Sequence, residues 1–121
     1  MITEKQAKTD LGNIKIHTRA IRTIAAIAAM EVEGVSRIYT GPVGRLYEFL
    51  GRDRNYAAVK VDLKENNEID IAVSIVVEYG RDIPRVANFV QENIRQAIEK
   101  MTGLMPLNID VKVKGIEKRL K

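Results

Sequence analysis

The sequence has 121 residues, of which 45% are hydrophobic and 30% charged, and its net charge is +4 at pH 7. This length and composition predict one globular domain that buries about two thirds of its unfolded surface. The chain lacks cysteine and has one histidine, His17. These counts exclude a disulfide scaffold, a cysteine-ligated metal and a thiol nucleophile, and they disfavour a two-metal centre. The longest apolar run, Ile24–Met30, is too short to span a membrane, so we expect a cytoplasmic protein.

The first part of the chain predicts a flexible arm, a short strand and a helix. Residues 1–10 lack periodicity, and residues 11–16 alternate weakly. Thr18 is the expected N-cap of a helix from Arg19 to about Val32, and Gly34 the expected left-handed cap at its end. The apolar arc of this helix holds Ile21, Ile24, Ala25, Ala28 and Val32, with Arg19, Arg22, Thr23 and Glu33 opposite.

The middle of the chain predicts a strand, an irregular loop and a hairpin. A strand over Val35–Tyr39 precedes residues 41–55, where glycine and proline recur and a helical turn is expected between Arg45 and Leu50. Residues 59–64 and 69–78 then alternate apolar and polar side chains around a turn at residues 66–67. This alternation indicates two half-buried strands.

A second helix and a last strand complete the pattern. Asp82 is the expected N-cap, Pro84 lies in the first turn, and Gly103 is the expected C-cap. The apolar arc of this helix holds Ile83, Val86, Ala87, Val90, Ile94, Ala97, Ile98 and Met101. Residues 107–114 alternate as a strand.

The order β-α-β-β-β-α-β predicts an α+β two-layer sandwich. We expect a mixed or antiparallel sheet of about four to five strands, with both main helices on one face. Residues 11–116 would form this single domain, after the arm at residues 1–10 and before a basic tail at residues 117–121.

No arrangement of residues indicates catalysis. Asp70 and Glu78 share a strand face but stand eight residues apart, too far to act on one substrate atom. Phosphate-binding and nucleophile motifs such as the Walker loop and G-x-S-x-G are absent from the sequence. We therefore expect a protein without enzyme activity, cofactor or metal.

The loop after residue 40 offers a nucleic-acid-binding hypothesis. Gly41-Pro42-Val43-Gly44 is a G-x-x-G loop, followed by residues that mix cations and aromatic rings as nucleic-acid-binding proteins do. The candidate nucleic-acid or anion contacts are Arg45, Tyr47, Arg52 and Arg54. Alternatively, this loop is structural.

Protein and lipid contacts have separate candidates. Phe89 falls outside the apolar arc of its helix, and Val76 lies on the polar face of its strand, so both are candidates for a protein interface. The candidate basic tail contacts for an anionic surface are Lys118, Arg119 and Lys121, whose attraction would be weak without a partner.

Long motifs in the chain resemble those of a known family. They are IDIAVSIVVEYG at residues 69–80, IPRVANFVQENIRQAIEKMTG at 83–103 and IDVKVKGI at 109–116, with GNIKIH at 12–17 and EGV at 33–35. Together they resemble the alkaline shock protein family of bacterial envelope stress proteins. The resemblance covers residues 11–116.

This resemblance implies a scaffold or adaptor that acts through protein partners. Family members are small cytoplasmic proteins. Some of them self-associate and gather at the membrane through a small membrane anchor protein. Others are linked to control of fatty-acid synthesis through acetyl-CoA carboxylase subunits. We therefore expect a non-enzymatic homo-oligomer with a role in cell-envelope homeostasis or fatty-acid synthesis, and a nucleic-acid-binding module as the alternative.

Overall fold

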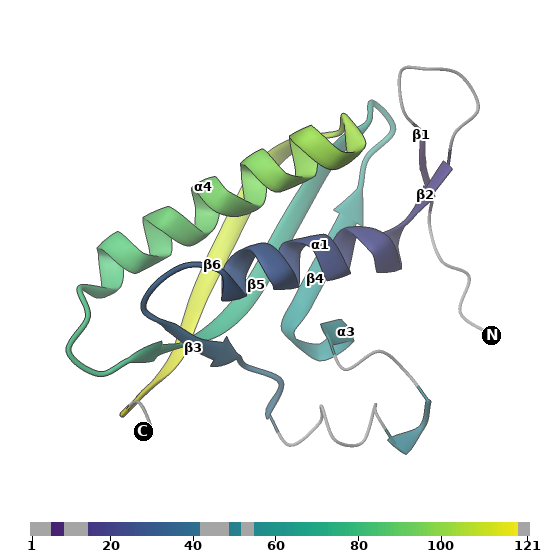
Figure 1. The fold of residues 1–121 in the computed structure, drawn as a ribbon. Coiled ribbons are helices and arrows are strands. Elements are labelled where there is room, and N and C mark those ends of the chain that lie inside the picture. The colour runs from purple at the N-terminus through teal and green to yellow at the C-terminus, as the bar shows by residue number, and fades with distance from the viewer. Residues whose placement is uncertain (1–5, 9–14, 42–48, 52–54, 119–121) are drawn as a thin grey trace.

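The computed structural model describes residues 6–8, 15–41, 49–51 and 55–118 of the chain (Figure 1). In chain order, its elements are β1 Gln6–Lys8, β2 Lys15–His17, α1 Thr18–Met30, β3 Val35–Ile38, α3 Asn55–Ala58, β4 Val59–Leu63, β5 Glu68–Glu78, α4 Ile83–Thr102 and β6 Met105–Glu117. Strand β1 pairs antiparallel with β2, so the prediction that residues 1–10 form only a loose arm is wrong at Gln6–Lys8. Strand β6 likewise extends to Glu117, into the predicted tail.

Strand β5 is the centre of the main sheet. Strand β4 pairs antiparallel with the first half of β5, and β3 pairs antiparallel with its second half, so these two short strands share one edge. Strand β6 runs parallel to β5 along the whole of the other edge. The sheet is therefore mixed, which is one of the two arrangements that the sequence analysis left open.

Both long helices cover the same face of this sheet (Figure 1). The side chains of β5 that point to the helices are almost completely buried; they are Ile69, Ile71, Val73, Ile75 and Val77. Helix α1 adds Ile21, Ala25 and Ala29 to the core, and α4 adds Val86, Val90, Ile94 and Ile98. No described element lies over the other face, and we call it the open face.

The ends of α4 follow the expected cap chemistry. The Asp82 carboxylate accepts a hydrogen bond from the Arg85 backbone N–H, and Gly103 ends the helix with φ of 74°. The ends of α1 differ from the prediction. The N-cap is His17, while Thr18 is the first helical residue and is buried. The helix ends at Met30, before Gly34.

Two side chains depart from the predicted helix faces. Arg22 is buried, although the periodicity placed it outward, because α1 packs against α4, β3, β4 and α3 and so buries more than one stripe. Met101 is exposed, although it lies within the predicted apolar arc of α4. At that end of the core Thr102 and Leu104 are buried in its place.

Val76 lies on the open face but is only 3% exposed, so the prediction that this side chain is accessible is wrong. Both neighbouring strands shift register beside Val76, which stands opposite Arg37 and Gly115. The Arg37 guanidinium reaches across β5 to the Glu117 carboxylate at 3.2 Å, and the Ser36 hydroxyl donates to the same carboxylate at 2.6 Å. These contacts join β3 to β6 above the central strand.

Gly34 is required by both backbone and packing. Its φ is 102°, and a Cβ there would lie 2.8 Å from Val86 Cγ2. We expect Gly34→Ala to lower the free energy of unfolding by roughly 2–4 kcal/mol in urea denaturation. Gly80→Ala is the matched control, because Gly80 has φ of 93° but open space around it, and should cost only about 1–2 kcal/mol. Equal losses in the two variants would show that the methyl group added at residue 34 is accommodated beside Val86 without an energetic cost.

The ion pair across β5 predicts that the stability of the fold depends on pH. Hydrogen bonds to the Glu117 carboxylate lower its pKa, and the bond from the Ser36 hydroxyl has a larger effect than the bond from the Arg37 guanidinium. A carboxyl whose pKa is lowered in the folded state adds stability above its unfolded pKa and loses it as pH falls through the folded value. The melting temperature of Glu117→Gln should thus fall furthest below that of the unmodified chain near pH 7, and this gap should narrow from about pH 5 to about pH 3. A gap that is constant over this range would contradict the assignment.

Candidate protein-binding groove

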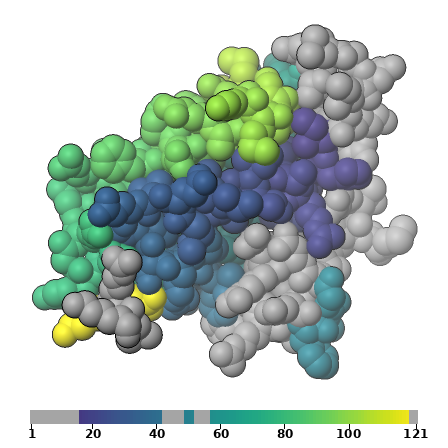
Figure 2. Space-filling view, in the orientation of Figure 1, coloured from purple at the N-terminus to yellow at the C-terminus, as the bar shows by residue number. Residues whose placement is uncertain are grey.

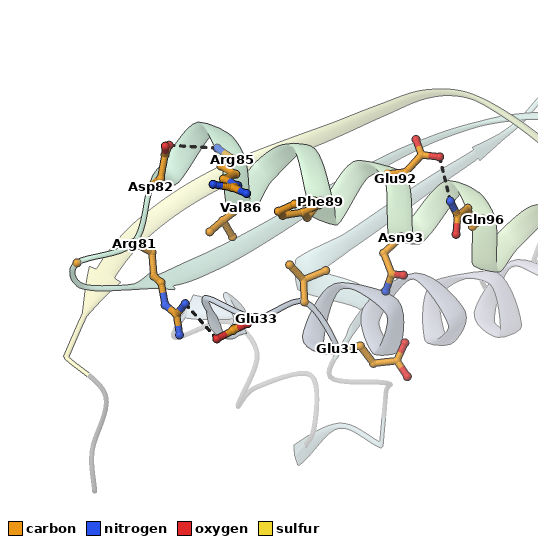
Figure 3. A pocket seen from close by; sticks show the side chains of 12 residues that line it. Glu31, Glu33, Arg81, Asp82, Arg85, Val86, Phe89, Glu92, Asn93 and Gln96 are labelled. Atoms are coloured by element: carbon orange, nitrogen blue, oxygen red, sulfur yellow. Dashed lines mark hydrogen bonds and ion pairs between the residues drawn. The ribbon is translucent and has the colours of Figure 1, made fainter.

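A groove of about 790 Å³ lies between the C-terminal end of α1 and the first half of α4 (Figure 3). It opens on the helix layer, away from the sheet. Its lining residues are Glu31, Val32, Glu33, Gly80, Arg81, Asp82, Arg85, Val86, Phe89, Glu92, Asn93 and Gln96.

The groove exists because α1 stops while α4 continues. Beyond Met30 the chain turns through residues 31–34 into β3, so the first turns of α4 have no helix beside them. Where the helices do meet, the small side chains of Ala25, Ala28 and Ala29 are buried. The Asn93 amide donates to the Ala28 carbonyl oxygen at 2.7 Å, which fixes the end of α1 against α4.

Apolar side chains form the floor of the groove. Val86 is buried and Val32 is half-buried, whereas Phe89 is 53% exposed. Complete burial of a phenylalanine side chain contributes about 1.5–3 kcal/mol, so a molecule that covers the exposed half would gain about 1 kcal/mol from this ring alone. Phe89 is therefore available as an anchor for a partner.

Charged side chains form the rim, with acids in excess. Arg81 is bound to Glu33 at 3.3 Å and to Glu78 at 3.2 Å, so its charge is already balanced. The guanidinium carbon of Arg85 lies 5.8 Å from the centre of the Phe89 ring, which is within cation–π range. The lining contains four carboxylates, on Glu31, Glu33, Asp82 and Glu92, and two guanidinium groups.

A second apolar surface adjoins the groove at the end of α1. Ile27 and Met30 are 56% and 46% exposed and line a shallow hollow with Ala26, Glu31 and Ile38. Glu31 lines both the hollow and the groove. Figure 2 shows this helix side of the molecule, with α1 and α4 at the front. Exposed apolar groups that gather beside one groove favour an interaction surface.

Only some of the predicted site residues lie in the described part of the structure. The exposure of Phe89 is confirmed, and the exposure of Val76 is wrong. Lys118 is exposed directly after β6, while Arg119 and Lys121 lie outside the described residues. The loop candidates also lie outside them; these are Arg45, Tyr47, Arg52 and Arg54. The predicted nucleic-acid, anion and tail contacts therefore remain predictions.

Sequence reasoning missed most of the groove. Glu31 and Val32 come from the turn that follows α1, and Arg81 and Phe89 come some 50 residues later. Helical spacing could have grouped the α4 residues of the groove, such as Arg85, Phe89 and Asn93, because residues four apart on a helix lie on the same face. It could not have joined them to residues 31–33.

Neither metal ligands nor a membrane span occurs in the described part of the chain. No group of three or more histidine, aspartate or glutamate side chains within it could hold a metal ion. Its helices are also too short or too polar to cross a membrane.

Comparison with known proteins identifies the family. Residues 6–118 match the model of the alkaline shock protein 23 family, which is described as having a cell envelope-related function. The chain is 40% identical to YqhY of Bacillus subtilis over 109 residues, which cover 90% of this chain and 80% of YqhY. It is 27% identical to YloU of the same organism, over 92% of this chain and 93% of YloU.

Solved structures show the same fold at low identity. MamM-CTD superposes with a TM-score of 0.56 and 15% identity, over 85% of this chain and all of that one. A double variant of MamM-CTD gives a TM-score of 0.54. The resemblance read from the sequence motifs is thus confirmed by the family match, and the chain belongs to the alkaline shock protein family, whose function is related to the cell envelope.

Proposed function

We propose that the chain is a non-enzymatic interaction module, which serves its envelope-related function by binding a protein partner in the groove between α1 and α4. The observation that carries this proposal is that Phe89 is half-exposed in the apolar floor of the groove, together with Val32 and Val86. Aromatic side chains in well-formed hollows are the commonest anchors of protein interfaces.

The groove favours a partner segment with an apolar side chain flanked by basic ones. The apolar side chain would cover Phe89 and Val32, and the bases would face Glu31 and Glu92. Glu31 has no ion-pair partner among the described residues, whereas the Glu92 carboxylate forms an ion pair with the Arg95 guanidinium at 3.8 Å. Glu31 is therefore the carboxylate with most to gain from a partner's cation.

The expected partners are those that the family resemblance implies. They are a small membrane anchor protein, which would place the chain at the membrane, and acetyl-CoA carboxylase subunits, which would link it to fatty-acid synthesis. Association of the chain with itself is a third outcome. All three candidate partners would bind through an apolar anchor, so the groove does not distinguish them. Affinity capture is needed to identify which of them binds.

The test compares two exposed apolar residues of α4 by affinity capture from native cell extract. Phe89→Glu should capture at least tenfold less of a specific partner, because a carboxylate would replace the apolar anchor and add to an acidic rim. Met101→Glu is the matched control, since Met101 is 67% exposed and does not line the groove. Equal capture by the two variants would contradict the groove as the binding site.

Two further arms make the result specific. Thermal melting should show that both variants fold, because both side chains are exposed. Nuclease treatment of the extract should leave the Phe89-dependent partner in place. A partner that disappears with nuclease would instead support the alternative hypothesis of nucleic-acid binding.

A further inference from the structure

The open face of the sheet holds a hollow of about 230 Å³ that the proposed function does not use. It lies where β3 and β4 meet along one edge of β5. The backbone N–H of Tyr39 donates to the Ser74 carbonyl oxygen at 2.9 Å, and β4 begins with Val59 opposite Val73. The described residues that line it are Tyr39, Thr40, Ala57, Ala58, Lys60, Ala72, Ser74, Lys112 and Lys114.

The floor of this hollow is low because β5 carries small side chains there. Lys60 of β4 stands opposite Ala72, and Lys112 of β6 stands opposite Ser74. Neighbouring strands lie 4.7–4.9 Å apart, and Ala72 and Ser74 are two residues apart along β5, so Lys60 and Lys112 originate roughly 12 Å apart on either side of it. Two lysine side chains can span that distance and approach one ligand between them.

The hollow is cationic, and its charge is not balanced internally. Lys60, Lys112 and Lys114 are exposed and make no ion pair with another described residue. No carboxylate is among the described residues that line the hollow.

Nearby carboxylates lie beyond its border. Glu117 is bound by Ser36 and Arg37, and Asp70 is bound by Lys64 at 3.5 Å. Asp110, in the β6 position opposite Ala72, is the nearest acid in register and is exposed to solvent. Asp62, two residues after Lys60 on the same face of β4, is exposed as well. Three lysines therefore line the hollow, and two exposed carboxylates, on Asp62 and Asp110, lie just outside it.

We propose that this hollow binds a phosphate-type anion, either a free phosphate or diphosphate or the terminal phosphate of a lipid headgroup. Its ligand carries two or more negative charges, which match the three lysines, and several acceptor oxygens. Tyr39, Thr40 and Ser74 also line the hollow, and their side chains carry hydroxyls, a group that can donate to such oxygens. The volume is about eight times the share of one water in the liquid, ~30 Å³, which leaves room for a diphosphate.

Inorganic pyrophosphate is the first probe, titrated into the full chain at constant ionic strength and followed by amide NMR. We expect saturable shifts centred on Ala72, Ser74 and Lys112, because these residues form the floor and wall. Combined replacement of Lys60, Lys112 and Lys114 by glutamine should weaken binding at least tenfold. Lys100→Gln is the matched control, because Lys100 is an exposed lysine at the end of α4.

Vesicles distinguish the two sources of the phosphate. Phosphatidylcholine vesicles with and without phosphatidic acid are tested for flotation of the chain. Flotation that requires phosphatidic acid and the three lysines, and that pyrophosphate displaces, assigns the hollow to a headgroup. Saturable pyrophosphate binding without flotation assigns it to a free anion.

Two results would overturn the proposal. The first is the absence of saturable pyrophosphate binding together with the absence of flotation. The second is a pyrophosphate affinity that is the same in the triple glutamine variant as in Lys100→Gln. Melting temperatures confirm that the triple variant is folded, since its three lysines are exposed. Because the groove lies on the helix side, failure here leaves the protein-binding proposal unaffected.

Discussion

Strand β5 needs hydrogen-bond partners on both edges along its whole length, and the rest of the structure depends on this requirement. Its helix-facing side chains are buried, so water cannot reach its backbone groups there, and an unpaired buried N–H or carbonyl would cost the free energy of a lost hydrogen bond. One edge is satisfied by β6 and the other by two short strands in succession.

Two short strands share one edge of β5, and the junction between them explains why part of the open face is hollowed. Where β3 ends and β4 begins, backbone and side chains leave a hollow above Ala72 and Ser74. Further along β5, at the register shift of β3, the Arg37 guanidinium is bound to the Glu117 carboxylate, and this ion pair covers Val76. The same strand therefore has an accessible segment and a closed segment on one face, and the difference arises from its neighbours.

The helix layer follows a similar logic. Helix α4 is long enough to match β5 and β6, whereas α1 is 13 residues long and ends where the chain must return to pair as β3. The unmatched part of α4 keeps Phe89 half-exposed beside a mixed charged rim. A groove of this kind suits recognition of a protein segment, and it lies on the opposite side of the sheet from the lysine hollow. Two different ligands could thus be held at once without a shared surface.

The sequence by itself determined the elements that depend on local chemistry. Alternation predicted β4 and β5, the turn at residues 66–67 is confirmed by a φ of 62° at Asn67, and Asp82, Pro84 and Gly103 predicted both ends of α4. Each of these signals acts over a few residues, through a side-chain period, a cap or a positive φ. The three longest family motifs fall almost entirely within β5, α4 and β6, so the resemblance could be found without the fold.

Only the tertiary structure decided what is buried between elements and where the hollows lie. Val76 alternates as an exposed residue, yet a bridge between residues 37 and 117 covers it. Arg22 lies on the polar side of its helix, yet several neighbours enclose it. The groove likewise joins Val32 to Phe89, and the lysine hollow joins Lys60 to Lys112. These pairings are set by strand register and by how far each helix extends over the sheet, and no local periodicity records either quantity.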